Sequence, residues 1–154
     1  MHMALPDIFT KPVTEEVIQR IDKITGNSLP LWGKMSGAQM LAHCCVSYEY
    51  VYENNHKPPG KFMKFILKMF VKNKVVTEIP YKRNSATAPD FVIKGDRNFE
   101  KEKARLTNYI RKTQELGADF FEGKESHSFG KLSVQEWNNM FYKHLDHHLT
   151  QFGV

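Results

Sequence analysis

Apolar residues recur every three or four positions along most of the chain, which is the period of an α-helix rather than the alternation of a β-strand. The clearest case is close to the C-terminal end, where one stripe contains Trp137, Met140, Phe141, His144, Leu145, His148, Leu149 and Phe152. The same spacing predicts a helix from Thr14 to near Gly26, and another from about Arg97 to Leu116. We expect Phe99, Leu106 and Ile110 to face inward on the latter.

Two further helix starts are indicated by capping boxes, in which a serine caps the third amide and a Glu or Gln side chain reaches back. Ser36 with Gln39 predicts a helix that runs to about Asn54, and Ser133 with Glu136 predicts a last helix that stops at Gly153.

The segment KFMKFILKMFVKNK has lysines at helical spacing on one side. It predicts an amphipathic helix that packs on the rest of the protein and buries Phe62, Phe65, Ile66, Met69 and Phe70. Two alternatives are a helix lying on an anionic membrane surface, and a helix lining a pocket entrance where lysines attract an anionic substrate. A long loop from Val75 to Gly95 follows.

These elements predict an all-α fold, a four-helix bundle with an extra amphipathic helix and a long loop between its second and third helices. A single domain spanning residues 1–154 fits this length. No signal peptide and no membrane-length apolar run is evident, so we expect a cytoplasmic protein with no membrane partner. The net charge of +5 is small and no nucleic-acid module is recognisable, so no nucleic-acid partner is expected.

Histidines are the most informative polar residues. His144 and His148 lie one turn apart within the apolar stripe of the last helix, a spacing that suits two ligands of one metal ion. The alternative is a buried pair that hydrogen-bonds with itself or with a carboxylate. His43, on the predicted second helix, is the third candidate ligand, and the neighbouring Cys44 is either a softer ligand or an inert buried thiol.

Two further histidines fall in predicted loops. His56 and His127 are expected at the surface, although His127 precedes the last helix closely enough to approach the mouth of a site.

Two stretches, PLWGKMSGAQMLAHC and FGKLSVQEWNNMFYKHLDHHLTQFG, resemble the DinB-like (YfiT-like) putative metalloenzyme superfamily, and in particular an uncharacterised bacterial branch with a terminal KHLDHHLxQFG motif. The resemblance extends to NSATAPDFVIKG and covers most of the chain. It implies an up-down-down-up four-helix bundle, often a homodimer, that holds a divalent metal on three histidines. By position, these are His43, His144 and His148.

Such a centre suits zinc, nickel or iron. It lowers the pKa of a bound water from about 16 to near 7, or it ionises a bound thiol. We therefore expect a metal-dependent enzyme of the thiol transferase or hydrolase type, acting on a small molecule or a low-molecular-weight thiol. The alternative is a non-catalytic helical binding protein that associates with a metal or with a membrane surface. Residues expected near the ligands are Gln39, Tyr48, Glu49, Tyr50 and Asp146.

Overall fold

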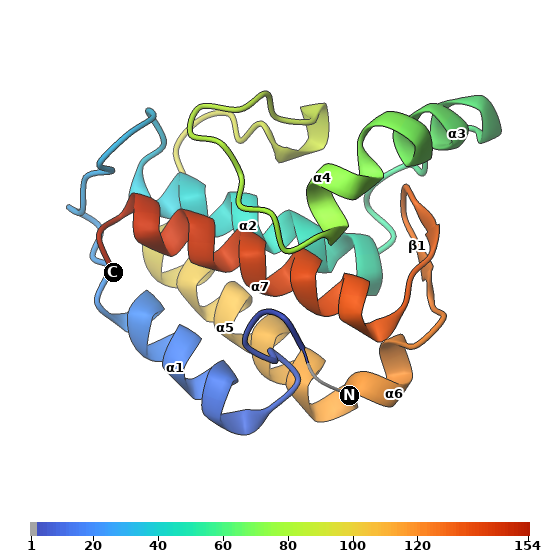
Figure 1. Cartoon of the computed structure of the whole chain (residues 1–154). Coiled ribbons are helices and arrows are strands. Elements are labelled where there is room, and N and C mark those ends of the chain that lie inside the picture. Colours follow the sequence, from blue (N-terminus) through green and yellow to red (C-terminus); the bar gives the residue numbers. More distant parts are fainter. Residues whose placement is uncertain (1–2) are drawn as a thin grey trace.

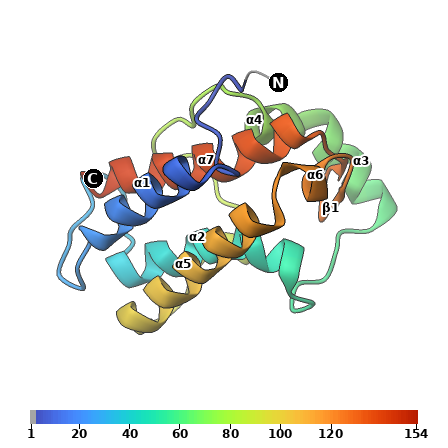
Figure 2. The ribbon, with the colours of Figure 1, turned by 90° about the horizontal axis from the view of Figure 1, so that it is seen from below.

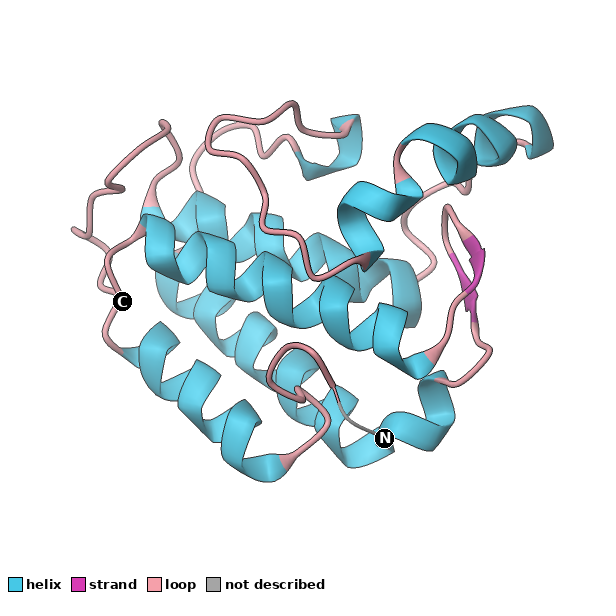
Figure 3. Cartoon of the chain, viewed as in Figure 1, coloured by secondary structure: helices cyan, strands magenta, loops and turns pink. Residues whose placement is uncertain are grey.

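The computed structural model describes residues 3–154, and most of them are helical (Figures 1 and 3). The helices are α1 (Lys11–Asp22), α2 (Gly37–Tyr52), α3 (Lys61–Phe70), α4 (Lys72–Val76), α5 (Phe99–Leu116), α6 (Ala118–Phe121) and α7 (Val134–Gln151), with a short 3-10 helix, η1 (Pro89–Phe91). A two-stranded antiparallel hairpin, β1 (Glu125–Ser126) with β2 (Gly130–Lys131), is the one sheet in the described residues. The expected all-α class is confirmed.

The four long helices pack side by side in a closed ring of contacts (Figures 1 and 2). Helices α1 and α2 both contact α5, and both also contact α7. Their apolar faces meet in a core that includes Ile21, Leu41, Tyr48, Leu106, Ile110, Trp137, Phe141 and Leu145. The predicted inward positions Leu106 and Ile110 are fully buried, whereas Phe99 is only partly buried at the edge of the core.

Both predicted capping boxes are present. The Ser36 side chain accepts from the Gln39 amide, and the Gln39 side chain accepts from the Ser36 amide. Ser133 and Glu136 make the same reciprocal pair at the start of α7. The two capping boxes set the first residues of α2 and α7, and these two helices supply the three clustered histidines described below.

The predicted start of α1 at Thr14 is wrong by about one turn. The helix begins at Lys11, with Pro12 in its first turn, where a missing amide hydrogen costs nothing. Thr14 is buried inside the helix, and its hydroxyl donates to the Ile8 carbonyl. Thr14 therefore does not cap the helix, and its hydroxyl instead connects the helix to the N-terminal segment. The helix also ends at Asp22, before the expected Gly26.

The predicted burial of the lysine-rich helix is also wrong. The segment forms two helices, α3 and α4, and only α4 packs against α7. Helix α3 projects from the body of the molecule at the upper right of Figure 1. Phe62 is 77% exposed, Phe65 57%, Met69 55% and Phe70 64%, and of the five expected residues Ile66 alone is half-buried. Only α4 is close enough to the body to bury an apolar residue, Val76, which is 3% exposed.

The segment that follows α4 is a long loop, as expected, interrupted by η1. The turn-rich stretch before α7 holds α6 and the hairpin. Among the described residues, no helix combines the length and the apolar character that crossing a membrane requires.

Candidate metal centre

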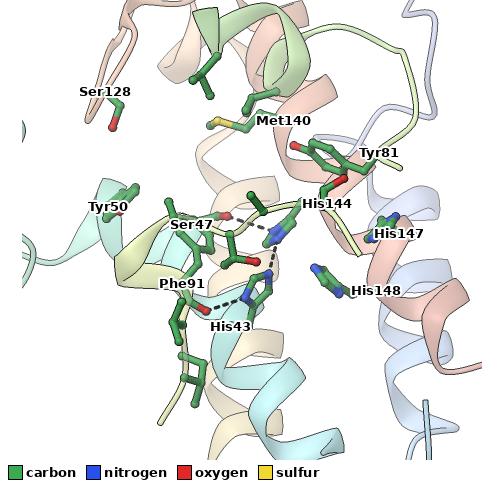
Figure 4. A pocket seen from close by; sticks show the side chains of 18 of the residues that line it. His43, Ser47, Tyr50, Tyr81, Phe91, Ser128, Met140, His144, His147 and His148 are labelled. Carbon is green, nitrogen blue, oxygen red and sulfur yellow. Dashed lines mark hydrogen bonds between the residues drawn. The ribbon is translucent and has the colours of Figure 1, made fainter. Parts of the chain in front are cut away.

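Three histidines from opposite ends of the chain meet between α2 and α7 (Figure 4). The Nε2 atoms of His43 and His144 lie 2.9 Å apart. One ring nitrogen from each of His43, His144 and His148 lies within 4.8 Å of the others. Nitrogens bound to one tetrahedral zinc ion at about 2.0–2.1 Å are about 3.3 Å apart, so the cluster needs only small side-chain shifts to surround an ion.

Each imidazole uses its Nδ1 atom for a hydrogen bond to the protein. The carbonyl oxygen of Phe91 lies 2.8 Å from Nδ1 of His43 and accepts its proton. The Ser47 hydroxyl lies 3.2 Å from Nδ1 of His144, and the Gln151 Oε1 lies 2.8 Å from Nδ1 of His148. Since Nδ1 of His43 donates to the Phe91 carbonyl, its Nε2 accepts a hydrogen bond from Nε2 of His144, and an ion between the rings would replace this one bond. Metal-binding histidines are typically oriented by outer bonds of this kind.

The partner of His148 is itself held in place. The Nε2 of Gln151 donates to the Trp32 carbonyl at 2.8 Å, which fixes its Oε1 toward the imidazole. Gly33 has φ +80°, and a Cβ atom built there would lie 2.7 Å from that Nε2. A side chain at this position would strain the left-handed backbone and would displace the amide of Gln151 from its bonds. Trp32, Gly33 and Gln151, which lie far apart in the sequence, thus meet beside His148.

Burial keeps the three rings neutral. It is the main cause that lowers the pKa of His43, which the hydrogen bond to Phe91 partly offsets. Burial and the neighbouring rings hold the pKa of His144 well below its ordinary value. The same causes lower the pKa of His148 to about 3. Neutral imidazole is the form that binds metals, so the cluster is ready to bind an ion near pH 7 without losing protons.

The cluster opens into a cavity of about 490 Å³. Its walls are largely apolar and come from six parts of the chain: the loop before α2, α2, α7, the loop before α5, the hairpin and the inner side of α3 and α4. Tyr81 stands beside His144 and His147 at one end, and Met140 lies farther along α7 (Figure 4). A small organic molecule with an apolar part fits such a space.

Most residues expected near the ligands lie elsewhere. Gln39 completes the cap of α2 and donates to the Gly95 carbonyl. The Tyr48 ring is buried in the core, stacked on Tyr109 and Phe141. Asp146 pairs with Arg20 at 2.8 Å on the far side of α7. Glu49 binds Arg105 and His56 rather than a ligand ring.

Tyr50 is the one expected neighbour that lines the cavity. His127 stacks on its ring with 3.7 Å between centroids and also lines the cavity, as the position before α7 allowed. His56 is not a free surface residue, because its Nε2 lies 2.6 Å from the Glu49 carboxylate. Cys44 lies outside the cluster as a buried thiol, and burial raises its pKa, so it is inert.

Phe91 and Gln151 are site residues that the sequence pattern did not indicate. A backbone carbonyl leaves no trace in the side-chain pattern, and Phe91 comes from the long loop. Gln151 did carry a signal: it follows His148 by three residues, which places both on one side of a helix. Ser47 carried the same kind of signal, one turn after His43.

Comparison with known proteins adds no relative: no family model, no curated protein and no solved structure matches the chain at a significant level. Any functional conclusion therefore depends on the geometry of the site.

Proposed function

We propose that this protein is a divalent-metal-dependent enzyme whose ion is held by His43, His144 and His148. The observation that carries the proposal is the convergence of three neutral imidazoles, each with its outer nitrogen already bonded to the protein. Three protein ligands leave a coordination position free, which is the arrangement of catalytic rather than structural sites.

The proposal also includes the family that the sequence resembles. A DinB-like, up-down-down-up four-helix bundle is consistent with the closed ring of contacts among α1, α2, α5 and α7. The resemblance also implies a homodimer. Nitrogen-only ligands suit zinc, nickel or iron, and carboxylate-preferring ions such as magnesium are disfavoured.

Such an ion supplies Lewis acidity at its free position, for a water molecule or a thiol. The residues of the chain then have separate tasks. Phe91, Ser47 and Gln151 orient the three rings, and the apolar cavity wall binds the organic part of a substrate and excludes water. A metal ion beside an apolar cavity favours one of two reactions of a small molecule: the transfer of a thiol to an electrophile, or hydrolysis.

The first test is the metal content of the purified protein. We expect about one divalent ion per chain in the wild type, and a large loss in His43→Ala, His144→Ala and His148→Ala. His147→Ala is the matched control, because His147 is on the same helix and lines the same cavity without joining the cluster. Equal metal content in all five proteins, measured by elemental analysis, contradicts the ligand assignment.

The second test is activity of the metal-loaded protein. Small thiols paired with electrophiles, and ester and amide substrates, cover the two proposed reaction types. Turnover should disappear with a chelator and return when the metal is added back. A protein that binds its ion and turns over none of these substrates is better described by the alternative, a non-catalytic binding protein.

A further inference from the structure

Helix α3 carries the largest group of exposed apolar side chains in the described part of the chain, and none of these side chains lines the cavity of the metal centre. Phe62, Met63, Phe65, Met69 and Phe70 are each 49–77% exposed. We call these five residues the α3 apolar face. Monomeric soluble proteins rarely leave such a cluster of large apolar side chains uncovered, and a cluster of this kind marks an interaction site.

The α3 apolar face is bordered by positive charge. Lys61, Lys64 and Lys68 recur at helical spacing along one side of it, and α3 contains no acidic residue. Within residues 3–154, none of these three lysines has an ion-pair partner, whereas Lys72, one turn later, pairs with Glu136. The helix thus combines bulky apolar side chains with an unneutralised row of ammonium groups.

The opposite side of α3 faces the protein. Leu67 of α3 and Val71, which directly follows the helix, line the cavity, so α3 is oriented with its bulky aromatic residues outward. Apart from α4, no element of the described chain has more than marginal contact with α3. Figures 1 and 2 both show α3 at the periphery, beside the hairpin.

We propose that α3 docks this protein on an anionic lipid surface, with the α3 apolar face in the boundary between headgroups and acyl chains. This is one of the alternatives that the sequence left open for this segment, and it departs from the main expectation of no membrane partner. Helices that lie in this boundary have a strongly apolar side and a lysine-rich polar side, as α3 does. Since α3 also forms part of the cavity wall, docking brings the cavity next to the lipid.

A second copy of the chain is the less suitable occupant. A symmetric contact of two α3 helices brings the rows formed by Lys61, Lys64 and Lys68 together, and α3 offers no carboxylate to separate them. Anionic headgroups supply the missing negative charge along the whole row.

The test is co-sedimentation of the full-length protein with phosphatidylcholine vesicles, with and without phosphatidylserine. We expect binding only to the anionic vesicles, and weaker binding at high salt. Lys64→Gln/Lys68→Gln should reduce binding about 25-fold, because each lysine near an anionic surface contributes about 1 kcal/mol, or about fivefold. Lys101→Gln/Lys131→Gln removes the same charge from exposed lysines elsewhere and should leave binding unchanged.

The apolar contribution is tested by Phe62→Ser/Phe65→Ser, for which we expect a more than tenfold loss of vesicle binding. Leu29→Ser/Ile79→Ser is its control, since Leu29 is 81% and Ile79 67% exposed away from α3. Thermal unfolding should be unchanged in all four variants, because none of the substituted side chains is part of the core.

Absence of vesicle binding by the wild type overturns the proposal, as does equal loss in the control variants. A dimer in sedimentation velocity that Phe62→Ser/Phe65→Ser dissociates, without vesicle binding, also overturns it and assigns the α3 apolar face to a second copy. All measurements are repeated after chelation. Vesicle binding is expected to be unaffected, so this result is independent of the metal centre.

Discussion

The amide side chain of Gln151 positions a candidate ligand without being one itself. It bonds His148 through its oxygen and the Trp32 carbonyl through its nitrogen, both at 2.8 Å. The carbonyl requires a donor, so only one orientation of the amide satisfies both bonds. In that orientation His148 carries its proton on Nδ1 and leaves Nε2 free. A residue that binds no metal thus decides whether its neighbour is able to.

Replacing Gln151 should therefore weaken metal binding without removing a ligand. We expect Gln151→Leu to lower the affinity about 10–100-fold, the usual effect of losing such a partner. Gln151→Glu retains an acceptor for His148 and should retain more of the affinity. Thr150→Val is the control on the exposed side of the same turn. Metal titration against a competing chelator measures all four proteins, and unchanged affinity in Gln151→Leu contradicts the positioning role.

At the scale of elements, α7 organises both the site and its surroundings. Its apolar stripe fills the core, its histidines line the cavity, and Lys143 holds α4 and the loop that follows it. The Lys143 ammonium group donates to three carbonyls, those of Lys74, Thr77 and Ile79, at 2.6–3.0 Å. Burial lowers the pKa of Lys143 to about 8, so the group is still charged at pH 7 and donates all three bonds.

Lys143→Met should accordingly loosen the attachment of α4 and of the loop that follows it to α7. Three carbonyls lose their donor, and we expect the free energy of unfolding to fall by about 1–3 kcal/mol. Hydrogen exchange should accelerate first at the amides of α4, since the rest of the core keeps its contacts. Lys101→Met, at an exposed position, should change stability by less than about 0.5 kcal/mol. Urea titrations that do not separate the two variants contradict the anchoring role of Lys143.

The sequence pattern predicted the elements best where one local signal determines the structure. Serine caps placed the starts of α2 and α7, and the histidine spacing selected the three residues that the fold brings together. It failed where the outcome depends on distant parts of the chain. Thr14 resembles a cap but bonds to Ile8, and the apolar side of α3 has no surface to cover. Periodicity shows that a helix has an apolar side, but it does not show which part of the protein covers that side.

For the molecule as a whole, the neutral histidines make stability depend on pH. In the folded, metal-free protein, burial lowers the pKa of His148 to about 3 and lowers those of His43 and His144 as well. In the unfolded chain all three titrate near 6.5. Between these values the unfolded chain binds more protons, so acid favours unfolding. The stabilisation that the three neutral histidines contribute is complete above about pH 6.5 and is lost progressively as the pH falls toward 3.

We therefore expect the free energy of unfolding of the chelated protein to decline steadily as the pH is lowered through this window. Changing all three histidines to Gln should flatten the decline, because the substituted side chains bind no protons in either state. A divalent ion at 100 times its dissociation constant should add about 2.7 kcal/mol near pH 7. That increment should persist until the pH approaches the lowered pKa values of the folded site, where protons compete with the ion for the ring nitrogens. Urea unfolding at several pH values, with chelator and with metal, separates the two effects. A metal increment that survives in the triple Gln variant would show that the ion stabilises the protein from another place.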